Sequence, residues 1–379
     1  STCTIPLLHL QGKDPMKQYR KSNGKAFTVL ELLVAVAVTA LLAGMLLNIT
    51  SQVAQTQTQA SGNLETNQVA QFVLDRIQED LQCAIYRNDG NVWMAADITN
   101  LTETSGNWNE KKYEVPKPPE QSLRVQLDQW PEELLNEKDT ANQQGSFSTA
   151  RYGIAGTWLR FFSGGPELDP SAENSGGARA ISYQIIRHGL TSSETSTPRY
   201  QLFRADVSDV NTLEAGYNLG AEDGPYFSQS ENGPRQSGNV KNPIFLDENG
   251  KLSTDFSLAS NIVDFGIRVY IIRSRSQGTG HLQQIFPDLN ATSDQYKYRA
   301  TTNPIYHDDK QRKYLYAFPD VIDVMIRVLT TEGSSVLAAY EEGLVPATEG
   351  MNEDEFWWDL VEKNSEVYIR RIKILSQGI

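Results

Sequence analysis

Hydrophobic residues form one long run near the start of the chain. Residues 27–49 read FTVLELLVAVAVTALLAGMLLNI, and Glu31 is their one charged residue. As an α-helix this run spans roughly 35 Å, enough to cross a ~30 Å hydrocarbon layer. Residues 1–26 carry five Lys and Arg against one Asp, whereas no charge occurs between Ile49 and Glu65. The positive-inside rule therefore predicts a single-pass transmembrane helix with a cytoplasmic N-terminus.

A second pattern, with the period of an amphipathic helix, follows the apolar run. Apolar residues recur at three- and four-residue spacing at Val69, Phe72, Val73, Ile77, Leu81, Ala84 and Ile85. The opposite face is expected to be polar and to hold Asp75, Arg76, Glu79 and Asp80, with Arg76 pairing with Asp80. We expect the helix to continue over residues 50–88, with a kink or break at Gly62 and a stop at Arg87–Gly90. Cys83 falls on the apolar side and is expected to pack as a small hydrophobe.

Residues 89–379 alternate β-rich runs with polar turns. Strands are expected at 122–127, 157–162, 178–187, 200–207, 262–273, 321–330 and 367–375. Loops are expected at 117–120, 163–177, 221–242 and 277–302, with a hairpin turn at Asn249-Gly250. The predicted fold class is α+β: a long N-terminal helix, half transmembrane and half amphipathic, packed on a large, mostly antiparallel β-rich head.

Two of the expected strands have similar sequences. Residues 262–269 read IVDFGIRV and residues 321–328 read VIDVMIRV. The similarity suggests equivalent strands in two sheet layers, or a duplicated βαβ-like half.

Composition narrows the range of functions. The formal net charge is −13 and no basic stripe relieves it, which argues against nucleic-acid binding and favours cationic partners or divalent ions. Two cysteines, Cys3 and Cys83, exclude a disulfide-rich scaffold and a Cys-based zinc cluster. HExxH, GxSxG, Walker A and CxxC signatures are all missing from the sequence, and the four histidines are scattered, so no enzymatic activity is predicted.

Two acidic segments could hold calcium, the one ligand that the sequence leaves open. They are Asp247–Gly250 with Asp255, and Glu353–Glu355 with Asp359. The alternative, which we favour, is a solvated acidic turn in each case. Phe356-Trp357-Trp358, inside the second segment, is expected to pack in the core rather than to anchor a partner or a sugar. No cofactor is predicted.

The start of the apolar run resembles a known processing signal. The stretch Gly24 to Val34, GKAFTVLELLV, is similar to the class III signal of type IV pilins and type II secretion pseudopilins. The resemblance implies that a prepilin peptidase cuts between Ala26 and Phe27, that Phe27 is then N-methylated, and that Glu31 is the fifth-position glutamate. In such filaments the α-amine of one subunit can meet the glutamate of a neighbour. Ala26 departs from the family, which usually has glycine before the cut.

Two further likenesses refine this interpretation. Residues 72–85, FVLDRIQEDLQCAI, resemble the helix end of J-type minor pseudopilins, and the large head resembles the pilin-like proteins of Verru_Chthon cassettes. The implied organisation is a cytoplasmic leader (1–26), a transmembrane helix (27–49), a stem extension (50–88) and a head outside the cytoplasm (89–379).

The function implied is that of a non-enzymatic minor pilin or pseudopilin of a type IV pilus or type II secretion-like filament. Its expected partners are other pilin-like subunits, met through the N-terminal helix, the prepilin peptidase and the inner membrane. The alternatives are a membrane-tethered periplasmic enzyme or carbohydrate- or ligand-binding protein with a pilin-like anchor, and an unprocessed signal-anchored structural protein.

Overall fold

The computed structural model describes residues 28–98, 156–164, 177–189, 198–220, 257–274, 280–287, 297–306, 316–351 and 353–375. The chain divides within its first helix into two compact units, residues 1–58 and 59–379. The strand expected at 122–127, the loops at 117–120 and 221–242, and the Asn249-Gly250 turn lie outside the described residues.

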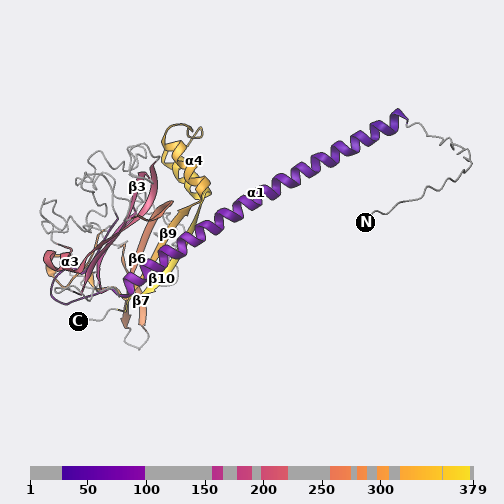
Figure 1. Ribbon diagram of the computed structural model, residues 1–379. Helices are drawn as coiled ribbons and strands as arrows, with labels where there is room; N and C mark the ends of the chain where they lie inside the picture. Colours follow the sequence, from indigo (N-terminus) through magenta and orange to yellow (C-terminus); the bar gives the residue numbers. More distant parts are fainter. Residues whose placement is uncertain are drawn as a thin grey trace, which may run out of the picture. The chain divides into compact units, whose positions relative to one another are not determined.

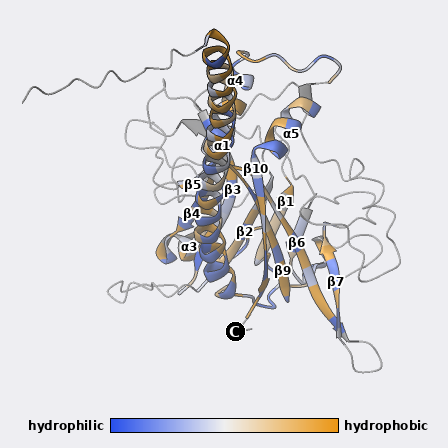
Figure 2. Ribbon diagram, turned by 90° about the vertical axis from the view of Figure 1, so that its right-hand side faces the viewer, coloured by the Kyte–Doolittle hydropathy of each residue, from blue (hydrophilic) through white to orange (hydrophobic). Residues whose placement is uncertain are grey.

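One uninterrupted helix, α1 (Val29–Gln82), runs through both units (Figure 1). The kink or break expected at Gly62 is absent from this described helix. A Cβ at Gly62 would lie 3.3 Å from Thr330 Cγ2, so the glycine allows a neighbouring segment of the head to approach α1 closely. Figure 2 shows the hydropathy of α1 changing along its length, from a strongly apolar N-terminal part to a mixed C-terminal part.

The helix ends earlier than the stop predicted at Arg87–Gly90. The residues after Gln82 pair with strand β2 instead: the Ile85 amide donates to the Phe162 carbonyl at 2.9 Å, and the Gly164 amide donates to the Cys83 carbonyl at 2.9 Å. β-pairing therefore replaces the last helical turn. Cys83 lies just beyond the helix as a half-buried free thiol.

Two antiparallel sheets make up the strands of the larger unit. The first has the order β5-β4-β3-β2-β1-β8, from β1 (Met94–Ile98), β2 (Thr157–Ser163), β3 (Arg179–Gly189), β4 (Pro198–Val207), β5 (Ser257–Ser260) and β8 (Lys297–Ala300). The second has the order β10-β9-β6-β7, from β6 (Ile262–Ser274), β7 (Gly280–Phe286), β9 (Val321–Leu329) and β10 (Ser365–Lys373). Each expected strand that falls on described residues is confirmed, with ends within two residues of the prediction. The mixed α+β class, with antiparallel sheets, is confirmed.

Two expectations about the strands are wrong. The segment 277–302, expected as a loop, contains β7 and β8. Strand β7 reads GHLQQIF, which lacks apolar alternation because it lies at the sheet edge and is mostly part-exposed. The two similar segments are neighbours in one sheet: β6 and β9 pair antiparallel, so that Asp264 faces Arg327 and Arg268 faces Asp323. Their likeness thus produces two cross-strand Asp–Arg pairs in register.

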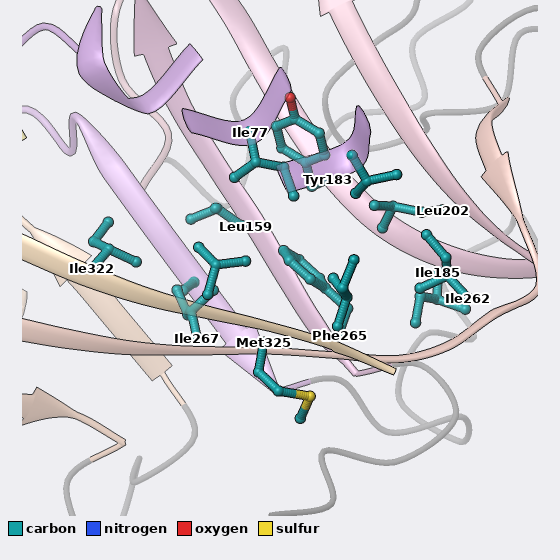
Figure 3. Close-up of a cluster of buried hydrophobic side chains, with 14 of the residues drawn as sticks. Ile77, Leu159, Tyr183, Ile185, Leu202, Ile262, Phe265, Ile267, Ile322 and Met325 are labelled. Carbon is teal, nitrogen blue, oxygen red and sulfur yellow. The ribbon is translucent and has the colours of Figure 1, made fainter. Parts of the chain in front are cut away.

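The main core joins both sheets to the second half of α1. Figure 3 shows side chains from β2, β3, β4, β6, β9 and α1 meeting there, among them Ile77, Leu159 and Phe265. The stripe predicted on α1 is buried at Val73, Ile77, Leu81 and Ala84, partly buried at Val69 and Ile85, and wrong at Phe72, which is 57% exposed.

Short helices complete the described head. They are α3 (Asp209–Ala215), the 3-10 turn η4 (Pro304–Tyr306), α4 (Thr331–Glu341) and α5 (Glu353–Lys363). Phe356, Trp357 and Trp358 on α5 are all buried, which confirms the prediction that this cluster packs in the core.

Candidate functional site

The first part of α1 is long and apolar enough to cross a membrane. This candidate span covers Val29–Ala54, and none of its side chains is buried within the structure. A signal sequence near an N-terminus passes the same test of helix length and apolar composition.

Threonine hydroxyl groups inside this span donate hydrogen bonds to backbone carbonyls of the same helix. The Thr39 hydroxyl donates to the Ala35 carbonyl at 2.9 Å, and the Thr50 hydroxyl donates to the Leu46 carbonyl at 2.7 Å. Such bonds suit apolar surroundings, because no water is there to pair with a free hydroxyl.

One side of the span is lined by small residues. Ala37, Ala40 and Gly44 border an open hollow together with the larger Leu41, Met45 and Asn48, and a Cβ at Gly44 would meet nothing within 4 Å. Small side chains at this spacing let a second helix approach closely, and Asn48 places a polar group on the same side.

The start of α1 carries a reciprocal capping arrangement. The Thr28 amide and hydroxyl both donate to Glu31 Oε2, at 3.0 and 3.1 Å, and the Glu31 amide donates to Thr28 Oγ1 at 3.2 Å. This is a capping box, which satisfies otherwise unpaired amides of the first turn and places a carboxylate at the positive end of the helix dipole. Ala26 and Phe27 lie outside the described residues, so the processing site has no geometry here.

The second part of α1 inserts a buried carboxylate into the first sheet. Asp80 accepts two hydrogen bonds from Arg204 on β4, Nε to Oδ2 at 2.6 Å and Nη2 to Oδ1 at 2.9 Å, and a third from the Tyr183 hydroxyl on β3. Arg204 also contacts Asp206 at 2.7 Å. Burial first, and then the Asp80 charge, hold the pKa of Tyr183 well above its ordinary value.

Placing Asp80 on the solvent face of α1 was therefore wrong. The residue is 7% exposed, although the expected pair with Arg76 is present at 3.9 Å. The helical spacing predicts this burial, because Asp80 lies seven residues after Val73, three after Ile77 and four before Ala84, which are all on the buried stripe. Helical phase, rather than residue type, therefore indicates the face on which Asp80 lies.

Polar contacts also join α1 to the second sheet. The hydroxyls of Thr66 and Tyr368 lie 2.9 Å apart, and Arg370 on β10 pairs with Asp75. Together with Asp80, these contacts attach the head portion of α1 to both sheets.

The Asp–Arg pairs of β6 and β9 continue onto β10. Arg371 donates to both oxygens of Asp323 at 2.7 Å and lies over the ring of Tyr270. Burial first, and then Asp323, raise the pKa of Tyr270 to about 12. Charge-assisted hydrogen bonds therefore join β9 to β10, and the contact of Arg371 with Tyr270 reaches β6.

Metal ligation was an open question from the sequence. Among the described residues, no group of three or more His, Cys, Asp or Glu side chains is placed to hold a metal ion. Asp359 pairs with Lys363 at 2.7 Å, whereas Asp247–Gly250 and Asp255 lie outside those residues. Calcium binding therefore stays a prediction.

Comparisons with known proteins found no matching protein-family model, curated protein or solved structure. What the fold defines is a mixed α and antiparallel-β protein whose N-terminal apolar helix continues into the core of its head.

Proposed function

We propose that this chain is a non-enzymatic pilin-like subunit, a minor pilin or pseudopilin of a type IV pilus or type II secretion-like filament. In this proposal it resides in the inner membrane with a cytoplasmic N-terminus, and its head lies in the periplasm or outside the cell. One observation carries the proposal: a single 54-residue helix combines a wholly exposed apolar part with a part buried in the head.

That construction suits assembly through the helix. The apolar part presents a face of small residues, Ala37, Ala40 and Gly44, against which another subunit's helix can pack. The buried part, from residue 59 onward, attaches α1 to the sheets of the head. A bulky head favours a minor subunit, because it would clash if repeated along a thin filament.

Glu31 has two separable roles under this proposal. It caps its own helix through Thr28, and its charge would pair with the α-amine of a neighbouring subunit cut before Phe27. Glutamine can keep the cap, because a capping box accepts Glu or Gln, but it cannot supply the charge. Removing one member of a buried ion pair costs about 3–5 kcal/mol, whereas losing a cap costs about 1 kcal/mol.

A three-variant series in the native host tests the proposal. The variants are Glu31→Gln, Glu31→Ala and, as the matched cap control, Thr28→Ala. Membrane-extracted chain is weighed intact to establish whether it begins at N-methyl-Phe27, and its share in high-molecular-mass assemblies is measured on gradients.

We expect processing in all three variants, normal assembly for Thr28→Ala, and at least a ~10-fold loss of assembly for both Glu31 variants, given the free energy of the lost pair. Glu31→Gln assembling like the wild type would remove the charge-pairing role. A wild-type chain that keeps residues 21–26 would overturn prepilin processing altogether.

A further inference from the structure

Helices α4 and α5 form a firmly held pair at one end of the head (Figure 2). Glu341, the last residue of α4, accepts hydrogen bonds from the Tyr200 hydroxyl of β4 and from Trp357 Nε1 of α5, the latter at 2.9 Å. Tyr340 stacks edge-on against Phe356, with ring centroids 4.9 Å apart. The pair is therefore a rigid base for the loop that connects its helices.

The loop leaves α4 through a well-formed C-terminal cap. The Leu344 amide donates to the Ala339 carbonyl and the Gly343 amide donates to the Tyr340 carbonyl, both at 2.9 Å, and Gly343 has φ of +75°. This is a Schellman motif, and a second positive-φ residue, Gly350, comes just before Met351 at the other end of the loop.

Apolar side chains on this loop face solvent. Leu344 is 72% exposed, Val345 37% and Met351 42%. In a Schellman motif the residue at the Leu344 position commonly packs back onto its helix, but here the leucine projects outward. This one loop therefore presents three apolar side chains to solvent.

Charge identifies the kind of partner. Residues 331–362 contain nine acidic residues and no Lys, Arg or His. Glu342 and Glu349 on the loop and Glu355 at the start of α5 are exposed, whereas Glu332 lies at the other end of α4. An anionic lipid surface would be repelled by these carboxylates, and so would the same acidic loop of a second copy.

We propose that the loop 342–351 docks a cationic amphipathic segment of a different polypeptide, with Leu344, Val345 and Met351 as apolar contacts inside an acidic rim. Apolar anchors supply the affinity, and the opposite charges select the partner. The proposal rests on the head alone and holds whether or not the chain assembles into a filament.

Binding of defined peptides to the full chain tests the proposal. The chain is placed in phosphatidylcholine nanodiscs and titrated against a fluorescent peptide of about 15 residues, with Leu at helical spacing and Lys elsewhere. A second peptide replaces each Lys by Glu, and empty nanodiscs measure binding to lipid alone. Anisotropy is recorded at about 0.05 M and about 0.5 M salt.

The variants separate apolar from charged contacts. Leu344→Ser with Met351→Ser removes anchors, and Glu342→Lys with Glu349→Lys reverses the rim. Ile305→Ser is the matched control, because Ile305 is 78% exposed but lies on η4.

We expect the Leu/Lys peptide to bind the wild type and the control equally, and each double variant at least ~10-fold more weakly, with salt weakening the wild type. The proposal is overturned if the Leu/Glu peptide binds as well, if both double variants bind like the wild type, or if empty nanodiscs account for the signal. Self-association of the chain that Leu344→Ser abolishes would also overturn it, by making a second copy the occupant.

Discussion

Replacing Asp80 by alanine tests how α1 is attached to the head. Asp80 is 7% exposed, and it binds Arg204 through two hydrogen bonds and Tyr183 through a third. The substitution leaves a largely buried guanidinium, 13% exposed, without its bidentate partner and a buried phenol without its acceptor. Asp75→Ala is the matched control, because Asp75 also pairs with a sheet arginine, Arg370, but its side chain is 65% exposed.

The expected loss can be worked from these contacts. Breaking a buried ion pair on one side costs about 3–5 kcal/mol. Arg204 keeps its hydrogen bond to Asp206 at 2.7 Å, so the cost of the broken ion pair should lie at the lower end of this range. The Tyr183 hydroxyl, left without an acceptor, adds to the loss. We therefore expect Asp80→Ala to lower the free energy of unfolding by about 3–4 kcal/mol, and Asp75→Ala by at most about 1 kcal/mol, as for exposed pairs.

Urea unfolding of the full chain in neutral detergent measures both values. The buried indoles of Trp93, Trp357 and Trp358 report unfolding by their fluorescence. The double variant Asp80→Leu/Arg204→Met should be less destabilised than Asp80→Ala, because apolar replacement of both partners removes the uncompensated charge. Equal losses for Asp80→Ala and Asp75→Ala would refute the assignment of Asp80 as a buried anchor.

Two further outcomes follow from the head. Burial holds the pKa of Tyr183 and of Tyr298 well above the ordinary value of 10.0, so above pH 10 the folded state keeps protons that the unfolded chain loses. The free energy of unfolding should therefore fall above pH 10 by about 1.4 kcal/mol per pH unit for each tyrosine. Tyr298→Phe should reduce that slope. A flat profile from pH 9 to about 11 would contradict this. A fragment beginning at Gln59 keeps the α1 side chains of the core and should unfold in a cooperative transition. A fragment covering 89–379 lacks Ile77 and its neighbours and should show no such transition. Cooperative unfolding of the 89–379 fragment would contradict the assignment of α1 to the core.

Sequence patterns predicted much of the fold because they report burial. A continuous apolar run and a stripe of helical period account for α1, and alternating β-branched runs located the longer strands. Strands β5 and β8 have only four residues each, and β7 is a polar edge, so their pairing depends on neighbours that no local pattern reveals. The early end of α1 also depends on a segment that is distant in the sequence, because the Ile85 amide bonds to the Phe162 carbonyl.

Polar sites were harder to predict than the core. Thr28 and Glu31 have the three-residue spacing of a capping box, a signal that the sequence itself contains. The partners of Asp80, by contrast, are more than a hundred residues away at Tyr183 and Arg204, and only the fold brings them together. The exposure of Leu344 is likewise invisible in sequence, because an outward leucine and a buried one look the same.

Buried polar contacts give α1 one register on the head. Apolar side chains alone would tolerate a shift of one helical turn, roughly 5.4 Å, since the stripe repeats at nearly that spacing. Such a shift would separate Asp80 from Arg204 and leave both charges buried, which makes the shifted packing costly. Near the other end of the contact, Thr331 donates to Glu65 at 2.8 Å, which ties the start of α4 to the same helix. The α4–α5 pair and its apolar loop are therefore held at a fixed position relative to residues 59–82 of α1, and a partner bound at the loop would engage that part of the helix and the head as one rigid body.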